Sequence, residues 1–205
     1  MDMDLAVRLT VIMVKSIGFG VYLLRLKRGE INPAASTWII LTLATVSSLA
    51  SYYVAENFNW RAGILNTIDV GFNAAVLVTV LFWNHSRVRF EPREKWYLGG
   101  VVFAVALWAT TGYAVGSNMV IQLVLVAAYV PTLDKVIQYQ GRSESYSVWG
   151  AGAIGGLLAL YPALLVQGNM LAALYTLRST ISCIIVIGLI TFFRLRPKVR
   201  AGLRP

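Results

Sequence analysis

Seven apolar runs, each near the length of a membrane-spanning helix and almost free of charge, limit most strongly how this chain can fold. They cover Leu5–Leu24, Ser36–Val54, Ala62–Trp83, Tyr97–Val115, Asn118–Leu133, Val148–Val166 and Met170–Phe193. A helix of about 20 apolar residues crosses the hydrocarbon core of a bilayer. The fifth run is short and contains Pro131, so its end is the least defined. We therefore predict an all-α transmembrane protein with seven helices.

Composition agrees with this fold class and excludes several functions. The chain is 58% hydrophobic and 13% charged, with a mean hydropathy of +0.67, whereas a soluble domain is about 25% charged. It has one cysteine, Cys183, and one histidine, His85. Metal and haem sites need several such ligands, so we expect no metal site and no cofactor. No G-x-S-x-G motif is present, and we expect no enzymatic activity.

The basic residues give an orientation. Fourteen of the eighteen Lys and Arg residues lie in the loops after the first, third and fifth spans and in the C-terminal tail. Only Arg8 and Arg61 lie on the other side. By the positive-inside rule we predict a plasma (inner) membrane protein with its N-terminus outside and its C-terminus in the cytoplasm. The net charge of +9 is then a topology signal, and we expect the lipid bilayer, not nucleic acid, as its partner.

The chain carries a weak internal repeat. When it is shifted by 111 residues, the first three spans match the last three in spacing, and a Ser-x-Trp motif at 36–38 falls on the one at 147–149. We predict two parallel three-helix repeats, 1–83 and 118–194, in a 3+1+3 plan. The segment 84–117 supplies a cytoplasmic loop and a linker helix, with 84–96 expected to be solvated, and 195–205 forms a basic cytoplasmic tail. Transporters built from parallel repeats hold the substrate near the midplane between the repeats.

Three ionisable side chains fall inside the predicted spans: Lys15, Asp69 and Arg178. With a rise of 1.5 Å per residue, all three lie at nearly the same depth, so a mutual network is expected. Each charge inside a membrane costs about 2.5–3.5 kcal/mol on insertion scales and needs a partner or water. Two interpretations stay open. The three residues form a structural ion network, or they form a substrate or proton site whose net charge of +1 suits an anion or a strongly polar solute.

Polar residues recur at helical spacing on four of the spans. The stripes are Arg8, Lys15 and Tyr22; Asn66, Asp69 and Asn73; Asn118, Gln122 and Tyr129; and Tyr175, Arg178 and Ser182. In lipid, such stripes must face protein or a wet cavity. We therefore predict a substrate site formed by Asn73, Asn66, Asp69, Arg178, Lys15, Ser182 and Gln122.

Two tryptophans and one proline carry two interpretations each. Trp38 and Trp149 come at the cytoplasmic ends of their spans, where an interfacial aromatic belt is favoured and a stacking platform for a ring is the alternative. Pro131 removes a backbone hydrogen bond, which makes it a gating hinge or a plain structural kink. Gly152 and Gly156 form a small-residue face for close helix packing.

Two motifs occupy corresponding places in the two halves. Tyr129–Thr132 is followed by a polar linker and by Glu144–Trp149, and Asn32–Trp38 stands at the matching place in the first half. This arrangement resembles the PQ-loop superfamily, which includes the SWEET and SemiSWEET sugar transporters. The resemblance implies a 3+1+3 fold with the N-terminus outside. It also implies that an asparagine on the third helix borders the substrate, and Asn73 is the best match, followed by Asn66.

These observations predict a membrane transporter or facilitator that moves a small-molecule solute by alternating access between the two repeats. The resemblance makes sugar the first guess, and the charges within the spans argue for a vitamin, a nucleoside-like or an anionic metabolite. The alternative is a non-transporting heptahelical receptor or sorting protein, because one fold serves several functions. A homo-oligomer is left open, since a chain with two repeats can complete a pathway alone or associate further.

Overall fold

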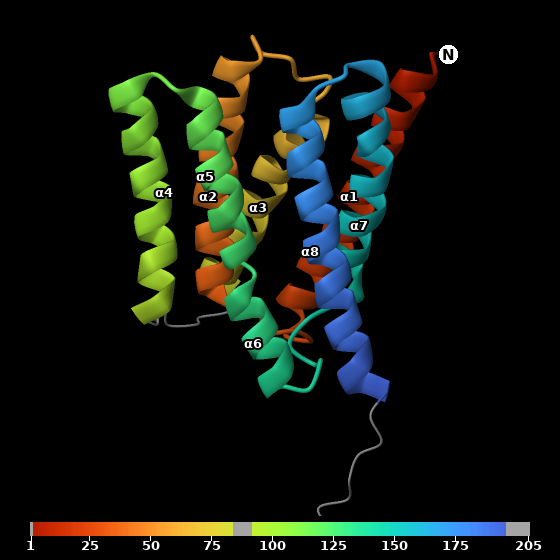
Figure 1. Ribbon diagram of the computed structural model, residues 1–205. Coiled ribbons are helices and arrows are strands. Elements are labelled where there is room, and N and C mark those ends of the chain that lie inside the picture. The colour runs from red at the N-terminus through yellow and green to blue at the C-terminus, as the bar shows by residue number, and fades with distance from the viewer. Residues whose placement is uncertain (1, 84–91, 196–205) are drawn as a thin grey trace, which may run out of the picture.

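The computed structural model describes residues 2–83 and 92–195, which fold into a bundle of long helices (Figure 1). The helices are α1 (Met3–Lys27), α2 (Ala35–Ala55), α3 (Ile64–Trp83), α4 (Pro92–Thr111), α5 (Ala114–Ala127), α6 (Val130–Gln138), α7 (Tyr146–Leu160), the π-helical turn η1 (Tyr161–Val166) and α8 (Met170–Leu195). No strand occurs in these two ranges. The predicted all-α class is confirmed.

Within the described ranges, six helical segments are long and apolar enough to cross a membrane, as in a membrane protein. They are Met3–Lys27, Ala35–Ala55, Ile64–Phe82, Ala114–Gln138, Tyr146–Val166 and Met170–Leu195. The seventh helix, α4, lies beside α5 and runs along it (Figure 1), but its first turn contains charged residues. That α4 also crosses the membrane stays a prediction.

The start of α4 corrects one expectation. The segment 84–96 was predicted to be a solvated linker, but the helix begins at Pro92. A proline suits the first turn of a helix because its missing N–H needs no partner there. Glu94 in this first turn is buried, and its carboxylate accepts a hydrogen bond from the Ser36 hydroxyl of α2 at 2.8 Å. Residues 84–91, which include His85, and 196–205 of the predicted tail lie outside the described residues.

The fifth predicted span is interrupted, as its proline suggested. It begins earlier than predicted, and α5 ends at Ala127 before α6 starts at Val130. Pro131 occupies the first turn of α6. Because it has no N–H to donate, the α-helical hydrogen-bond ladder cannot run through this point.

The two ends of the bundle differ in charge. One end, here called the basic end, holds the end of α1, the start of α4, the loop between α6 and α7 and the end of α8 (Figure 1). Its described basic residues are Arg25, Lys27, Arg28, Lys95, Lys135, Arg142 and Arg194. The opposite end holds Arg8 and Arg61.

Small residues on α7 allow two helices to approach it closely. A Cβ atom added at Gly18 of α1 would lie 2.1 Å from the Cβ of Ala151 on α7. On another side of α7, a Cβ at Gly152 would lie 2.5 Å from the Cys183 sulfur, and one at Gly156 would lie 2.0 Å from the Thr180 hydroxyl oxygen. The predicted packing role of Gly152 and Gly156 is confirmed: they let α8 approach α7 closely, as Gly18 and Ala151 do for α1.

Gly18→Ala should destabilise the protein, whereas Gly20→Ala on the same helix should not. The added methyl at Gly18 collides with Ala151 and with the Ser147 carbonyl oxygen at 2.7 Å, and overpacking of this kind costs about 1–3 kcal/mol. The same methyl at Gly20 meets no atom of the described residues within 4 Å, so it should stabilise the helix by about 0.5–1 kcal/mol. Thermal denaturation in detergent measures both, and equal melting temperatures for the two variants would contradict this packing.

Candidate functional site

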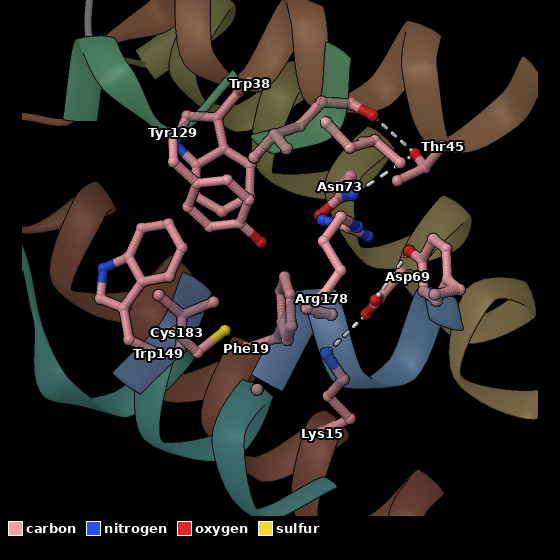
Figure 2. A pocket seen from close by; sticks show the side chains of 16 residues that line it. Lys15, Phe19, Trp38, Thr45, Asp69, Asn73, Tyr129, Trp149, Arg178 and Cys183 are labelled. Carbon is pink, nitrogen blue, oxygen red and sulfur yellow. Dashed lines mark hydrogen bonds and ion pairs between the residues drawn. The ribbon is translucent and has the colours of Figure 1, made fainter. Parts of the chain in front are cut away.

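A cavity lies at the centre of the bundle, and six of the helices contribute to it (Figure 2). Its volume, taken as the space open to the centre of a water molecule, is about 30 Å³. One water needs roughly 10–15 Å³ by this measure, so the space suits a few waters. Lys15, Asp69, Asn73 and Arg178 lie on one side of the cavity, and the rings of Trp38, Tyr129 and Trp149 lie on the other (Figure 2). A metabolite can enter only if the helices move apart.

The charged side is built on an ion pair between the first and third helices. Lys15 Nζ of α1 lies 2.5 Å from Asp69 Oδ1 of α3, and both side chains are buried. The other carboxylate oxygen of Asp69 accepts a hydrogen bond from the Tyr175 hydroxyl of α8 at 3.0 Å. The predicted common depth of Lys15 and Asp69 is therefore confirmed, and their charges cancel.

Arg178 of α8 joins this group without a direct ion pair. Its guanidinium carbon lies 4.7 Å from the centre of the Tyr175 ring, and its Nε donates to Gln122 Oε1 of α5 at 2.9 Å. The buried Nη1 of Arg178 donates to no atom of the described residues. None of the ion pairs found within 2–83 and 92–195 includes Arg178. The cavity therefore holds one uncompensated positive charge with a donor that has no partner there.

Of the remaining predicted site residues, Asn73 alone lines the cavity. Asn73 lines the cavity beside Lys15, Asp69 and Arg178, and its amide donates to the Thr45 hydroxyl at 3.4 Å. Gln122 lies outside the lining, and its side-chain oxygen accepts the hydrogen bond from Arg178 Nε.

Three other predicted residues lie away from the cavity lining. Asn66 donates to the Ser48 hydroxyl at 3.2 Å and borders a second, smaller void. Ser182 is buried on α8 but does not line the cavity. Pro131 starts α6, beyond Tyr129 of the aromatic side.

The aromatic side corrects the expectation of an interfacial belt. Trp38 and Trp149 are 1% and 3% exposed, line the cavity, and stack with ring centres 6.0 Å apart. Tyr129 packs against Trp149 with ring centres 5.7 Å apart. A belt residue must reach the lipid interface, and these rings do not. We call Trp38, Tyr129 and Trp149 the aromatic floor, because both tryptophans lie near the basic-end starts of α2 and α7.

Sequence reasoning missed several lining residues. Ser179 and Cys183 line the cavity and follow Tyr175 at intervals of four residues on α8. That spacing places the three on one helix face, so the signal was present. Glu144 does not line the cavity but lies behind it, and it was missed for another reason. A carboxylate in a loop is expected in water, yet this one is fully buried and accepts a hydrogen bond from the Trp149 indole N–H at 3.1 Å.

Single substitutions of the Lys15–Asp69 pair should cost far more stability than the double substitution. Lys15→Met leaves the Asp69 carboxylate buried and unpaired, and Asp69→Asn does the same to the Lys15 ammonium. Breaking a buried pair in this way costs about 3–5 kcal/mol. The double variant removes both charges and should recover most of that loss in thermal denaturation. Costs that simply add would show that the two charges do not interact.

No protein-family model, curated protein or solved structure matches the chain. The motif resemblance to the PQ-loop superfamily therefore stays a prediction.

Proposed function

We propose that this chain is a transporter or facilitator that moves a small polar solute across a membrane by alternating access around the central cavity. One observation carries the proposal: Arg178 lines the central cavity opposite an aromatic floor, and its buried Nη1 donates to none of the described residues. A polar group without a partner in a membrane interior is costly. A bound solute or water is the simplest group to satisfy it.

The proposed two-repeat plan is supported by the helix bounds. Residue numbers that differ by 111 relate Met3–Lys27 to Ala114–Gln138 at both ends, and they relate Ala35–Ala55 to Tyr146–Val166 in the same way. The helix contacts follow the same correspondence: α1 packs against α7, and its counterpart α5 packs against α2. The first helix of each half thus contacts the second helix of the other half. In this plan α4 is the linker that keeps both repeats parallel.

Alternating access suits the small size of the cavity. With room for a few waters only, the described conformation is one in which the halves are closed around the site. Two features interrupt regular helix where the halves would bend: Pro131 between α5 and α6, and the turn η1, which begins Tyr161-Pro162. Half-helices and breaks of this kind are common in transporters, so we assign Pro131 a gating role.

The charges define the class of solute. Lys15 and Asp69 neutralise each other, so the net charge of +1 comes from Arg178. A guanidinium presents a planar fork that suits a carboxylate or a phosphate. We therefore propose an anion, or a neutral solute rich in acceptors, held by Arg178 and Asn73 and packed against the aromatic floor.

The setting follows from the charge asymmetry of the two ends. The basic end would face the cytoplasm of a plasma (inner) membrane, which puts the N-terminus outside. The plan and orientation are those of PQ-loop transporters such as the SWEET proteins, and we propose that the chain is a distant member of that superfamily. The receptor or sorting alternative remains an outcome of the experiments below.

Arg178→Gln should abolish ligand stabilisation of the purified protein. Detergent-solubilised wild type is heated with single members of a panel of carboxylates, phosphates, sugars, nucleosides and vitamins. A ligand at one hundred times its Kd stabilises by about 2.7 kcal/mol, which raises the melting temperature measurably. Asn73→Ala should weaken the same hit. Arg61→Gln is the matched control, because Arg61 is exposed at the opposite end, and it should behave as wild type.

Uptake of the hit into liposomes that contain the pure protein then separates the two functions. Uptake above empty liposomes, lost in Arg178→Gln and kept in Arg61→Gln, supports transport. A ligand that stabilises the protein but is never taken up would overturn transport and favour a receptor. Absence of any hit, together with variants that are merely less stable, would leave the charges with a structural role only.

A further inference from the structure

The loop between α6 and α7 buries a carboxylate directly behind the aromatic floor. Glu144 is 0% exposed and lies between the segments Ala114–Gln138 and Tyr146–Val166, outside both. Its Oε2 accepts hydrogen bonds from the Tyr22 hydroxyl of α1 at 3.0 Å and from the Trp149 indole N–H at 3.1 Å. Its Oε1 is buried and accepts none from the described residues. Oε2 thus accepts two hydrogen bonds, whereas Oε1 accepts none from the described residues.

The charged groups around Glu144 do not neutralise it. Those that face the loop from the surrounding helices are Lys135 on α6, Arg194 on α8 and Arg25 on α1. The ammonium of Lys135 donates to Asn32 Oδ1 and to the Pro33 carbonyl oxygen. Arg194 donates to the backbone oxygen of Glu144 at 2.9 Å, and Arg25 donates to the Ser145 hydroxyl at 3.3 Å.

No cation therefore pairs with the carboxylate itself within the described residues, and Glu144 is absent from the ion pairs found there. Burial raises the pKa of the Glu144 carboxyl from 4.5 to about 7, while its hydrogen bonds from Tyr22 and Trp149 and the charge of Lys135 oppose part of that rise. Near neutral pH the group can therefore exchange a proton.

We propose that Glu144 is a proton-binding site that controls the aromatic floor: it is protonated while the floor is closed, and it releases its proton to water at the basic end as the floor opens. The proposal rests on the transport function argued above, because it gives the floor the role of a gate. It adds a coupling ion, the proton, to that function.

The connection to the floor is direct. Trp149 donates its N–H to Glu144, lines the cavity and stacks on Trp38. Tyr22, the other donor, packs against Trp38 with ring centres 5.5 Å apart. An ionised Glu144 can recover its lost hydration only by reaching water at the basic end, and that movement pulls on Trp149.

Linkage sets the direction of the effect. A conformation that binds a proton more tightly is favoured at low pH, and one that releases it is favoured at high pH. Since the closed floor surrounds Glu144 with protein, the closed conformation is the one that holds the proton. Raising the pH through about 7 should therefore open the floor.

Infrared titration of the detergent-purified full chain tests the proton site without any solute. The C=O band of a protonated carboxylic acid should disappear from wild type with a midpoint near pH 7. Glu144→Gln, which keeps an acceptor for the Trp149 N–H, should lack that band. Glu30→Gln, which removes an exposed carboxylate at the basic end, should keep it. A wild type with no carboxyl titrating near neutral pH, or a band that survives in Glu144→Gln, would overturn the proposal.

Thermal denaturation gives a second readout with a definite sign. The protonated form of a group with a raised pKa contributes stability that is complete below pH 4.5 and is lost as the pH rises toward 7. The melting temperature of wild type should therefore fall over this interval relative to that of Glu144→Gln. Parallel pH profiles for the two proteins would contradict a raised pKa.

The coupling to the floor is tested with Cys183, the only cysteine of the chain, which lines the cavity. The rate at which a small thiol reagent labels it should rise with pH faster in wild type than in Glu144→Gln. The ionisation of the thiol itself is common to both proteins, so the ratio of the two rates isolates Glu144. A constant ratio would overturn the control of the floor. A titrating Glu144 in a protein that transports none of the solutes would instead overturn transport and leave the proton site standing.

Discussion

Hydrocarbon offers no hydrogen bonds, so each polar side chain of this bundle must find its partner within the protein, either in its own helix or in another. The hydroxyl of Ser48 on α2 shows how far this constraint reaches. It accepts from Asn66 of α3 at 3.2 Å and from Gln122 of α5 at 3.2 Å, and Gln122 in turn accepts from Arg178 of α8 at 2.9 Å. One small acceptor thus ties three helices together and carries the network to the fourth. The cavity exists where this network stops short of satisfying Arg178.

The same constraint explains which parts of the site the sequence could predict. Polar residues spaced at three, four and seven positions must share a helix face, and all four predicted stripes point into the protein. Depth could also be predicted, since rise per residue is constant, and Lys15 meets Asp69 as expected. The hydrogen-bond partner of Arg178 could not be predicted from the sequence. Whether Arg178 bonds to Asp69 or to Gln122 depends on how each helix is rotated about its axis, and close contacts such as Gly152 of α7 against Cys183 of α8 constrain that rotation.

Two errors share one physical cause, which is that hydropathy reports composition and not surroundings. Trp38 and Trp149 stand near span ends, where both belt and interior tryptophans occur, and only packing against Tyr22 and Tyr129 identifies them as interior. Glu94 looked like part of a solvated loop until Ser36 of α2 gave its carboxylate a buried partner. In both cases the deciding atoms come from a different segment of the chain.

The first two helices of the proposed halves have matching bounds, but the floor differs between them. The N–H of Trp149 is held by Glu144, whereas the buried N–H of Trp38 donates to no described residue. At the offset of 111 that relates the helices, the position matching Glu144 is Pro33, which has no side-chain acceptor. In the proposed gate, Glu144 would hold Trp149 directly and would reach Trp38 only through Tyr22, which donates to Glu144 and packs against Trp38. The proton would then act first on the tryptophan of the second proposed half, while the first supplies the ring on which Trp149 stacks.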